Sequence, residues 1–266
     1  MELSDLNPAQ RAAVEHDKGP LLVVAGAGTG KTQVITRRIA YLILERGIPA
    51  EQILALTFTD KAALEMQERV DSLLPYGVVD TNIMTFHSFG DQIIREYGME
   101  IGLNSGGTVM SSAQQLIFLR DHFDELNLNY FAPIGRPDSL LGELARYFGR
   151  LKEEMVTPDQ YLAYKAPEDE AERHTELAQA FATYCRLTRE EGVLDFADQI
   201  AIPLEILSTR PHVARQLRER YKYILVDEFQ DTNVSQNKLV QEIAGESGNI
   251  MVVGDDDQSI YKFRGA

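Results

Sequence analysis

The chain is poor in cysteine and in long apolar runs. Cys185 is the only cysteine among its 266 residues, which excludes a disulfide framework and a metal site built from several thiolates. No apolar run approaches the roughly 18 residues of a membrane span. The first residues form neither a basic region nor an apolar signal core. A reduced, cytoplasmic location without membrane contact is therefore expected.

Positive charge is also scarce, with 26 Lys and Arg against 41 Asp and Glu and a net charge of −15. Nucleic acids are polyanions, so this balance argues against broad electrostatic binding to them, and no segment forms a basic tail. Any nucleic-acid site must be local, with few charges and with aromatic stacking. The hydrophobic share of 44% and the charged share of 25% are those of a globular protein and exclude wholesale disorder.

Both ends of the chain alternate between strand and helix patterns. Short apolar runs typical of strands stand at residues 21–25, 53–58, 83–86, 223–226 and 249–253. The first run lies between Gly-Pro and a glycine and is expected to be buried on both faces of a sheet. Amphipathic helical stripes follow the first two runs. This alternation predicts an α/β fold with a doubly wound parallel sheet flanked by helices.

The middle of the chain has a different pattern, in which helix-forming residues dominate and convincing strand runs are scarce. Helices are expected at about 113–126, 139–155 and 170–191. Strand patterns resume near residue 223. We therefore predict a discontinuous α/β domain of residues 1–92 and 194–266. An all-α insertion domain of residues 93–193 would interrupt it.

The most specific motif follows the first expected strand and opens a helix. It reads Ala25-Gly26-Ala27-Gly28-Thr29-Gly30-Lys31-Thr32, a P-loop pattern apart from alanine in place of the first glycine. Small residues let backbone N–H groups turn towards a phosphate, and the helix N-terminus adds partial positive charge. Lys31 would reach the β- and γ-phosphates, and the Thr32 hydroxyl would ligate Mg²⁺.

A second motif lies at the end of the 223–226 strand, where Asp227 and Glu228 stand together. Asp227 is placed to hold Mg²⁺ at the carboxyl end of the strand. Glu228 is placed to orient and deprotonate an attacking water. With the P-loop, these carboxylates predict Mg²⁺-dependent hydrolysis of a nucleoside triphosphate.

Five further blocks relate the chain to a family. Residues 227–233 (DEFQDTN) resemble the DExQ motif of UvrD/Rep-type superfamily 1 DNA helicases. The Q motif, motif Ia, motif Ib and motif III of that family are similar to residues 6–10, 55–63, 85–88 and 252–266. These blocks occur in the family order and span residues 6–266. A further block, residues 194–198, is equally well explained as a helix start capped by Asp195.

The resemblance implies roles for two glutamines in an ATP site. Gln10 would read adenine, because one amide can both donate and accept a hydrogen bond. Gln258 would contact the γ-phosphate and couple it to the DNA site. Gln33 stands where many relatives have an arginine near adenine, which predicts a looser nucleotide pocket.

The resemblance also implies a single-stranded DNA site. Phe58, Tyr261 and Phe263 would be stacking platforms for bases, although core packing is an alternative for Phe58. Contacts to phosphate or sugar are expected from Thr59, His87 and Arg264. Many relatives have Asn at the position of Asp60 and Trp at that of Phe263, so backbone contact would be weaker and stacking area smaller.

These observations predict the N-terminal part of an ATP-dependent DNA helicase with ATP and Mg²⁺ as cofactors. By resemblance, its RecA-like domain 1A is interrupted by helical domain 1B, and the complete enzyme adds domains 2A and 2B. That enzyme would move 3′→5′ on single-stranded DNA and separate strands at a junction with duplex. The chain alone is expected to be nearly inactive. The alternatives are the helicase-like part of an AddA/RecB-type recombination nuclease and a P-loop binding module that unwinds nothing.

Overall fold

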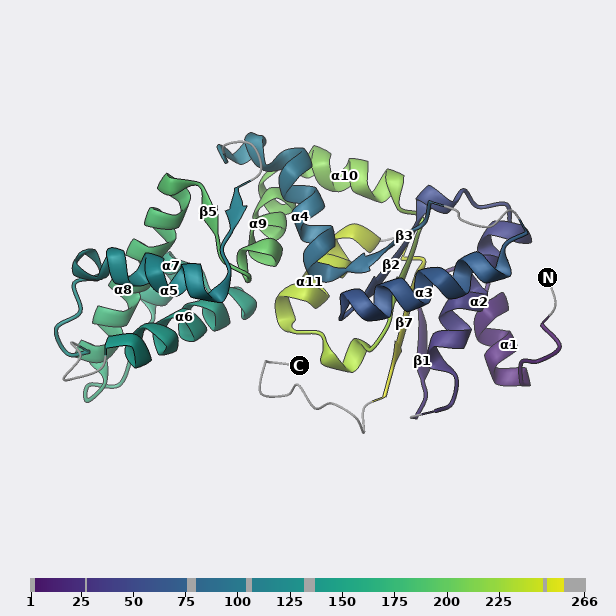
Figure 1. Ribbon diagram of the computed structural model, residues 1–266, viewed down its shortest axis with the longest axis horizontal. Helices are drawn as coiled ribbons and strands as arrows, with labels where there is room; N and C mark the ends of the chain where they lie inside the picture. Colours follow the sequence, from purple (N-terminus) through teal and green to yellow (C-terminus); the bar gives the residue numbers. More distant parts are fainter. Residues whose placement is uncertain are drawn as a thin grey trace. The chain divides into compact units, whose positions relative to one another are not determined.

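The computed structural model describes residues 3–26, 28–75, 80–103, 107–131, 137–245 and 248–255. The chain forms two compact units, one of residues 1–89 and 207–266 and the other of residues 90–206 (Figure 1). Both boundaries fall inside helices, α4 (Phe86–Tyr97) and α9 (Asp198–Thr209). The boundaries expected from the sequence lie elsewhere: 92/93 falls inside α4, and 193/194 falls within a two-residue strand of the second unit.

Unit 1 is built on a five-stranded parallel sheet with strand order β1-β7-β6-β2-β3. The strands are β1 (Leu21–Val24), β2 (Ile53–Thr57), β3 (Asn82–Thr85), β6 (Tyr223–Val226) and β7 (Ile250–Gly254). Because all five are parallel, their carboxyl ends meet at one edge of the sheet. The predicted α/β fold with a parallel sheet flanked by helices is confirmed.

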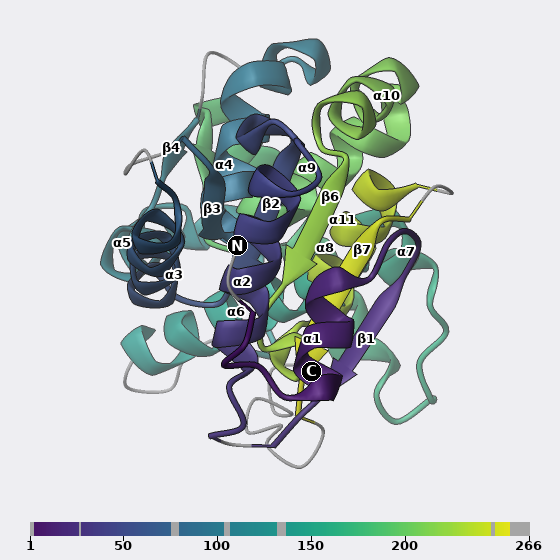
Figure 2. The ribbon, with the colours of Figure 1, turned by 90° about the vertical axis from the view of Figure 1, so that its right-hand side faces the viewer.

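Helices cover both faces of this sheet. Helices α1 (Pro8–Glu15), α2 (Lys31–Leu44) and α3 (Asp60–Leu73) pack side by side on one face. Their apolar residues form one core with alternate residues of the strands, among them Val14, Ile35, Ile39, Met66, Val70, Ile53, Ala55, Leu225 and Val253. Helix α11 (Val234–Ala244) contacts β6 from the opposite face and packs against α10 (Pro211–Arg220) (Figure 2).

The expectation that the first strand is buried on both faces is wrong. β1 lies at the end of the strand order and pairs with β7. Leu21 and Val23 pack against the core beneath α1 and α2. Leu22 and Val24 point to the other face, where they are 64% and 63% exposed. An apolar run gives no period from which to tell a central strand from an edge strand, because every position is hydrophobic.

Unit 2 is formed mainly by helices. They are α5 (Ser112–Asp121), α6 (Pro137–Glu153), α7 (Pro158–Ala163) and α8 (Ala171–Glu191), followed by α9. Aromatic and leucine side chains from these helices fill a core that includes Phe118, Leu119, Leu144, Phe148, Phe181, Tyr184 and Leu187. The helix expected at 113–126 ends as an α-helix at Asp121 and continues after a break as a 3-10 turn, η3 (Phe123–Leu126).

Unit 2 also contains a short parallel pair of strands, β4 (Thr108–Val109) and β5 (Val193–Leu194). Two backbone hydrogen bonds flank this pair of strands, from Thr108 N to Gly192 O and from Met110 N to Leu194 O. In the residues of the insertion that the structure describes, this pair is the only regular structure that is not helical. Two-residue strands are too short to give an alternating pattern, so the sequence carried no signal for them.

One buried ion cluster joins three helices of unit 2. Lys152 on α6 lies 2.6 Å from Asp195 and 2.7 Å from Asp198, and the Tyr184 hydroxyl on α8 donates to Asp195. Burial disfavours the charged ammonium, but the two carboxylates raise the pKa of Lys152 above its ordinary value. Asp195 and Asp198 also accept from each other's backbone N–H, so Asp195 closes the turn that starts α9. The helix-start interpretation of residues 194–198 thus has a structural basis.

The remaining regular segments are short 3-10 helices at Ala50–Gln52 (η1), Gly98–Ile101 (η2) and Phe229–Asp231 (η4). Within the described ranges, none of the helices combines the length and apolar character that a membrane crossing requires.

Candidate nucleotide site

The glycine-rich loop links β1 to α2 at the carboxyl edge of the sheet. Gly28 and Gly30 have φ values of 72° and 88°, which favour glycine because a Cβ is strained there. Gly30 is the N-cap of α2, and no side chain in the described part of the chain caps this helix. The first backbone N–H groups of α2 therefore remain available for an anion, with the partial positive charge of the helix end behind them.

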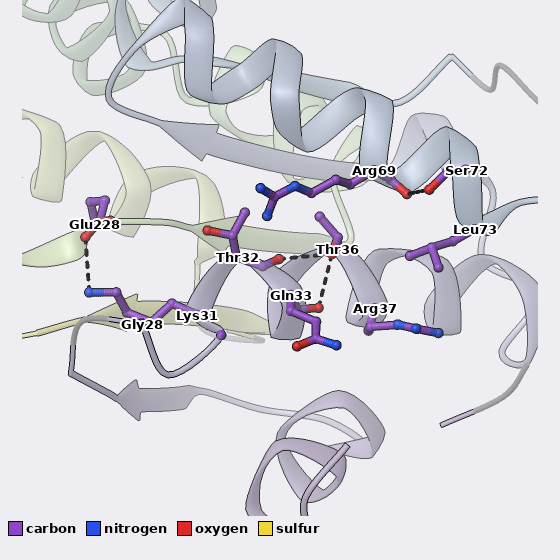
Figure 3. Close-up of a pocket in the computed structure, with 11 residues that line it drawn as sticks. Gly28, Lys31, Thr32, Gln33, Thr36, Arg37, Arg69, Ser72, Leu73 and Glu228 are labelled. Atoms are coloured by element: carbon purple, nitrogen blue, oxygen red, sulfur yellow. Dashed lines mark hydrogen bonds and ion pairs between the residues drawn. The ribbon is translucent and has the colours of Figure 1, made fainter. Parts of the chain in front are cut away.

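Lys31, the first residue of α2, faces two carboxylates that follow neighbouring strands. Its Nζ lies 3.5 Å from Glu228 Oε2 (Figure 3) and 3.9 Å from Asp255 Oδ2. The Lys31 side chain is only 9% exposed. The sheet thus brings the lysine of the loop after β1 beside the carboxylates after β6 and β7. A phosphate at the loop would compete with these carboxylates for the ammonium.

Among the predicted site residues that the structure describes, Asp227 is the most buried, with 4% exposure. Its backbone N–H donates to Leu56 O, and its Oδ1 accepts from the Glu228 N–H at 3.0 Å. Burial and, after it, the Glu228 charge raise the pKa of Asp227 to about 6, while the Glu228 backbone N–H and Lys31 act in the opposite direction. A cation beside this carboxylate would offset its burial and keep it ionised.

Glu228 has an unusual backbone conformation, with φ 50° and ψ 45°. A non-glycine residue in this left-handed region costs on the order of 1–3 kcal/mol, so the surrounding contacts must hold it there. Its carboxylate accepts from Gln230 Nε2 at 2.7 Å and pairs with Lys31. The side chain is 39% exposed, so water can reach it.

A pocket of about 670 Å³ opens beside these residues. It is lined by Gly28, Gly30, Lys31, Thr32, Gln33, Thr36, Arg37, Arg69, Ser72, Leu73 and Glu228. Its volume falls in the range of small-molecule sites. Lys31, Thr32 and Glu228, predicted separately from two motifs, meet here.

The same pocket contains two arginines that sequence reasoning missed. Figure 3 shows Arg69 of α3 with its guanidinium directed across the pocket above Thr32. Arg37, one turn after Gln33 on α2, donates to Asp5 at 2.7 Å, and Gln33 donates to the same carboxylate. The helical spacing between Gln33 and Arg37 was the available signal, because residues four apart share a helix face.

Gln10 lies against the P-loop. Its side-chain oxygen accepts from Asn7 N–H in a capping box at the start of α1, and its Nε2 donates to Thr29 O at 2.9 Å. A side-chain amide has two donor hydrogens and two acceptor lone pairs. One hydrogen and one lone pair are therefore not used by these two bonds, and they are the pair that an adenine edge would need.

The comparisons with known proteins agree with this geometry. A family model described as the UvrD/REP helicase N-terminal domain matches residues 6–266. The chain is 42% identical to ATP-dependent DNA helicase UvrD1 of Mycobacterium tuberculosis, over 99% of this chain and 34% of that protein. It is 39% identical to ATP-dependent DNA helicase PcrA of Bacillus subtilis, over 99% and 34%. It is also 39% identical to ATP-dependent DNA helicase Rep of Escherichia coli, over 98% and 37%.

The chain belongs to the UvrD/Rep helicase family. This is a family of ATP-dependent DNA helicases, and the predicted resemblance is confirmed. The chain spans about a third of the length of the three relatives.

Three residues that the UvrD/Rep resemblance assigns to DNA lie at the same sheet edge as the nucleotide pocket. Phe58 follows β2 and is partly exposed, and exposed Thr59 caps α3 by accepting from Ala62 N–H. His87 is partly exposed in the first turn of α4, directly after β3. β2 and β3 are paired neighbours, so these residues follow adjacent strand ends. A stacking platform must be accessible to a base, and Phe58 meets this condition because the core does not fully enclose it.

The other candidate residues from the sequence lie outside the described residues. They are Ala27 of the P-loop and Gln258, Tyr261, Phe263 and Arg264 of motif III. Within the described residues, no cluster of three or more His, Cys, Asp or Glu side chains is arranged to hold a metal ion. This is compatible with Mg²⁺, which takes one or two protein oxygens together with phosphates and water.

Proposed function

We propose that unit 1 binds and hydrolyses Mg-ATP at the pocket beside α2. The observation that supports this most directly is the placement of Lys31 Nζ within 3.5 Å of the Glu228 carboxylate, at an uncapped helix N-terminus. The β- and γ-phosphates would accept hydrogen bonds from the backbone N–H groups of residues 26–31 and from the Lys31 ammonium. Glu228 would then act on the attacking water.

Thr32 and Asp227 fit a magnesium ion. Both offer hard oxygen ligands, and a cation at this place would offset the burial of the Asp227 carboxylate. Bound magnesium would supply positive charge for the phosphate oxygens. Thr32 is at the start of α2 and Asp227 follows β6, so each is fixed by a regular element.

Adenine recognition is proposed for Gln10, which lies against the P-loop, together with Gln33 and Arg37 of the pocket lining. The Gln10 amide keeps one donor and one acceptor beyond its bonds to Asn7 and Thr29. Many relatives have an arginine at the position of Gln33, and Arg37 supplies a cation one helical turn away. The bond from Gln10 to Thr29 O would join base recognition to the phosphate loop.

Lys31→Ala is expected to lower the affinity for a non-hydrolysable ATP analogue tenfold or more, about 1.4 kcal/mol, because it removes the ammonium that offsets phosphate charge. Isothermal titration of the 266-residue chain with the analogue, in the presence of Mg²⁺, measures this affinity. The matched control is Lys238→Ala, whose ammonium pairs with Glu242 on α11. Unchanged affinity in a folded Lys31→Ala protein would disprove the assignment.

We further propose that the family's DNA strand runs over the carboxyl edge of the sheet. Phe58 and the motif III aromatics would stack bases, and Thr59, His87 and Arg264 would contact the backbone. Stacking accepts any base, which suits a protein that moves along a strand. With a net charge of −15, binding should be weak and should fall steeply with salt.

Phe58→Ala, Tyr261→Ala and Phe263→Ala should each weaken single-strand binding by roughly 1–3 kcal/mol, to a similar extent for all base compositions. Fluorescence anisotropy with labelled oligonucleotides of different composition measures this. Tyr164→Ala, which removes an exposed tyrosine of unit 2, is the control. Affinity unchanged in all three variants, or lost for one base sequence only, would refute the stacking proposal.

As a whole, the chain would be the N-terminal motor half of a helicase that moves 3′→5′ on single-stranded DNA in the cytoplasm and separates strands at a duplex junction. Domains 2A and 2B would complete it, and the chain alone would be nearly inactive. The names of the relatives, all helicases, favour this over an AddA/RecB-type nuclease subunit. Stimulation of the complete protein's ATPase by single-stranded DNA would separate a motor from a P-loop binding module.

A further inference from the structure

One side-chain amide joins the candidate base to the end of a neighbouring strand. Gln230 lies in the 3-10 turn η4, directly after Asp227 and Glu228. Its Nε2 donates to Glu228 Oε2 at 2.7 Å, and its Oε1 accepts from the Asp255 N–H at 3.0 Å. The first bond is charge-assisted and is stronger than a bond between neutral groups.

The end of β7 has room for this amide only because residue 254 is glycine. A Cβ at Gly254 would lie 2.8 Å from Gln230 Oε1 and 3.3 Å from Gln230 N. Real Cβ atoms do not approach an oxygen as closely as 2.8 Å, so any larger residue would displace the amide or the strand. Gly254 and Gln230 are therefore a matched pair, although 24 positions apart.

Glu228 needs a partner that stays when nucleotide binds. Its carboxylate has two described partners, Lys31 and Gln230. A phosphate at the P-loop would draw the Lys31 ammonium away from Glu228. The Gln230 bond does not involve the phosphate site, and it holds Oε2 while leaving Oε1 for a water. It also opposes relaxation of the left-handed Glu228 backbone.

We propose that Gln230 is a positioning residue for ATP hydrolysis: it orients Glu228 from the end of β7, in the space that Gly254 leaves open. This inference rests on the proposed ATPase function of unit 1. Gln230 touches neither nucleotide nor water in this role and acts only through Glu228. Its loss should therefore slow the chemical step and spare nucleotide binding.

The test is single-turnover hydrolysis of radiolabelled ATP with the chain in excess, together with titration of a non-hydrolysable analogue. In Gln230→Ala, affinity should stay within about threefold while the rate at saturation falls tenfold or more. Gln230→Glu keeps the shape and can accept from Asp255 N–H, but its carboxylate cannot donate to Glu228. It should be at least as slow as Gln230→Ala. Gln241→Ala, an exposed amide on α11, is the matched control and should keep the normal rate.

Gly254→Ala provides an independent variant. It should slow hydrolysis in the normal chain but add little to Gln230→Ala, because the shortened side chain removes the 2.8 Å approach to Oε1 and leaves only the 3.3 Å approach to the backbone N. Two residues acting through one contact are non-additive in this way. Additive losses, or a normal rate in both Gln230 variants, would overturn the proposal. So would a loss of nucleotide affinity as large as the loss of rate.

Two reference variants separate this inference from the proposed function. If the normal chain does not bind ATP, or if Glu228→Gln hydrolyses at the normal rate, the ATPase proposal itself fails. If Lys31→Ala loses binding and Glu228→Gln loses turnover while both Gln230 variants keep the normal rate, only the positioning role is disproved.

Discussion

Replacing Glu228 by Gln is expected to leave Mg-ATP binding near normal while hydrolysis slows at least a hundredfold. The substitution keeps the shape of the side chain and an oxygen that can accept from Gln230, but it removes the group that takes a proton from water. Lys31 remains to bind phosphate. The P-loop and the Asp227 carboxylate are unchanged.

Titration calorimetry and single-turnover hydrolysis measure the two effects separately. Glu242→Gln is the matched control, because Glu242 is a carboxylate on α11 that pairs with Lys238 and Arg218. It should hydrolyse ATP at the normal rate. Near-normal turnover in Glu228→Gln would mean that Glu228 is a solvated carboxylate at a strand end and that another group activates the water.

The 266-residue chain on its own is expected to hydrolyse ATP about 10³–10⁵ times more slowly than a complete motor. An arginine finger contributes this factor by stabilising charge on the γ-phosphate oxygens. By the resemblance to UvrD/Rep helicases, we expect these fingers in motifs IV and VI, which follow motif III in the family order. The cations lining the described pocket, Lys31, Arg37 and Arg69, all belong to unit 1. None of these three closes on the nucleotide from a second domain.

A typical enzyme turns over at about 10 s⁻¹, so the expected rate is about 10⁻² to 10⁻⁴ s⁻¹. Single-turnover assays with radiolabelled ATP and single-stranded DNA follow such rates. The chain should separate no forked duplex, because stepping needs two domains that close and open. DNA-stimulated turnover of several per second would contradict this expectation. Size-exclusion chromatography of the active sample would then show whether a second copy supplies an arginine.

Prediction from the sequence worked best where a motif and a regular element coincide. Lys31, Thr32, Asp227 and Glu228 each stand at a junction between a strand and the next segment. A parallel sheet necessarily brings such junctions to one edge. The two motifs could therefore be placed together before the strand order was known, although almost 200 residues separate them.

Side-chain relations between distant segments could not be predicted. The letter Q in the DExQ motif marks Gln230. The neighbouring sequence does not show that its amide reaches Asp255 or that Gly254 makes room for it. Arg69 was missed for a related reason. It lies on the third turn of α3, and only the packing of α3 beside α2 brings it to the P-loop.

The strand order has a consequence for the time course of folding during synthesis. β1 is made first, yet its sheet partner β7 is the last strand in the described part of the chain. In the described residues α3 is the only helix between β2 and β3, so these strands can pair soon after residue 85 leaves the ribosome. Unit 2 is one continuous segment, complete at residue 206.

Long-range pairs close late, because a large loop must be ordered before the contact forms. Domains also fold in the order in which they leave the ribosome. We therefore expect the inserted unit to be folded while the domain that it interrupts is still open. The P-loop after β1 would gain its neighbours after β6 and β7 only in the last step.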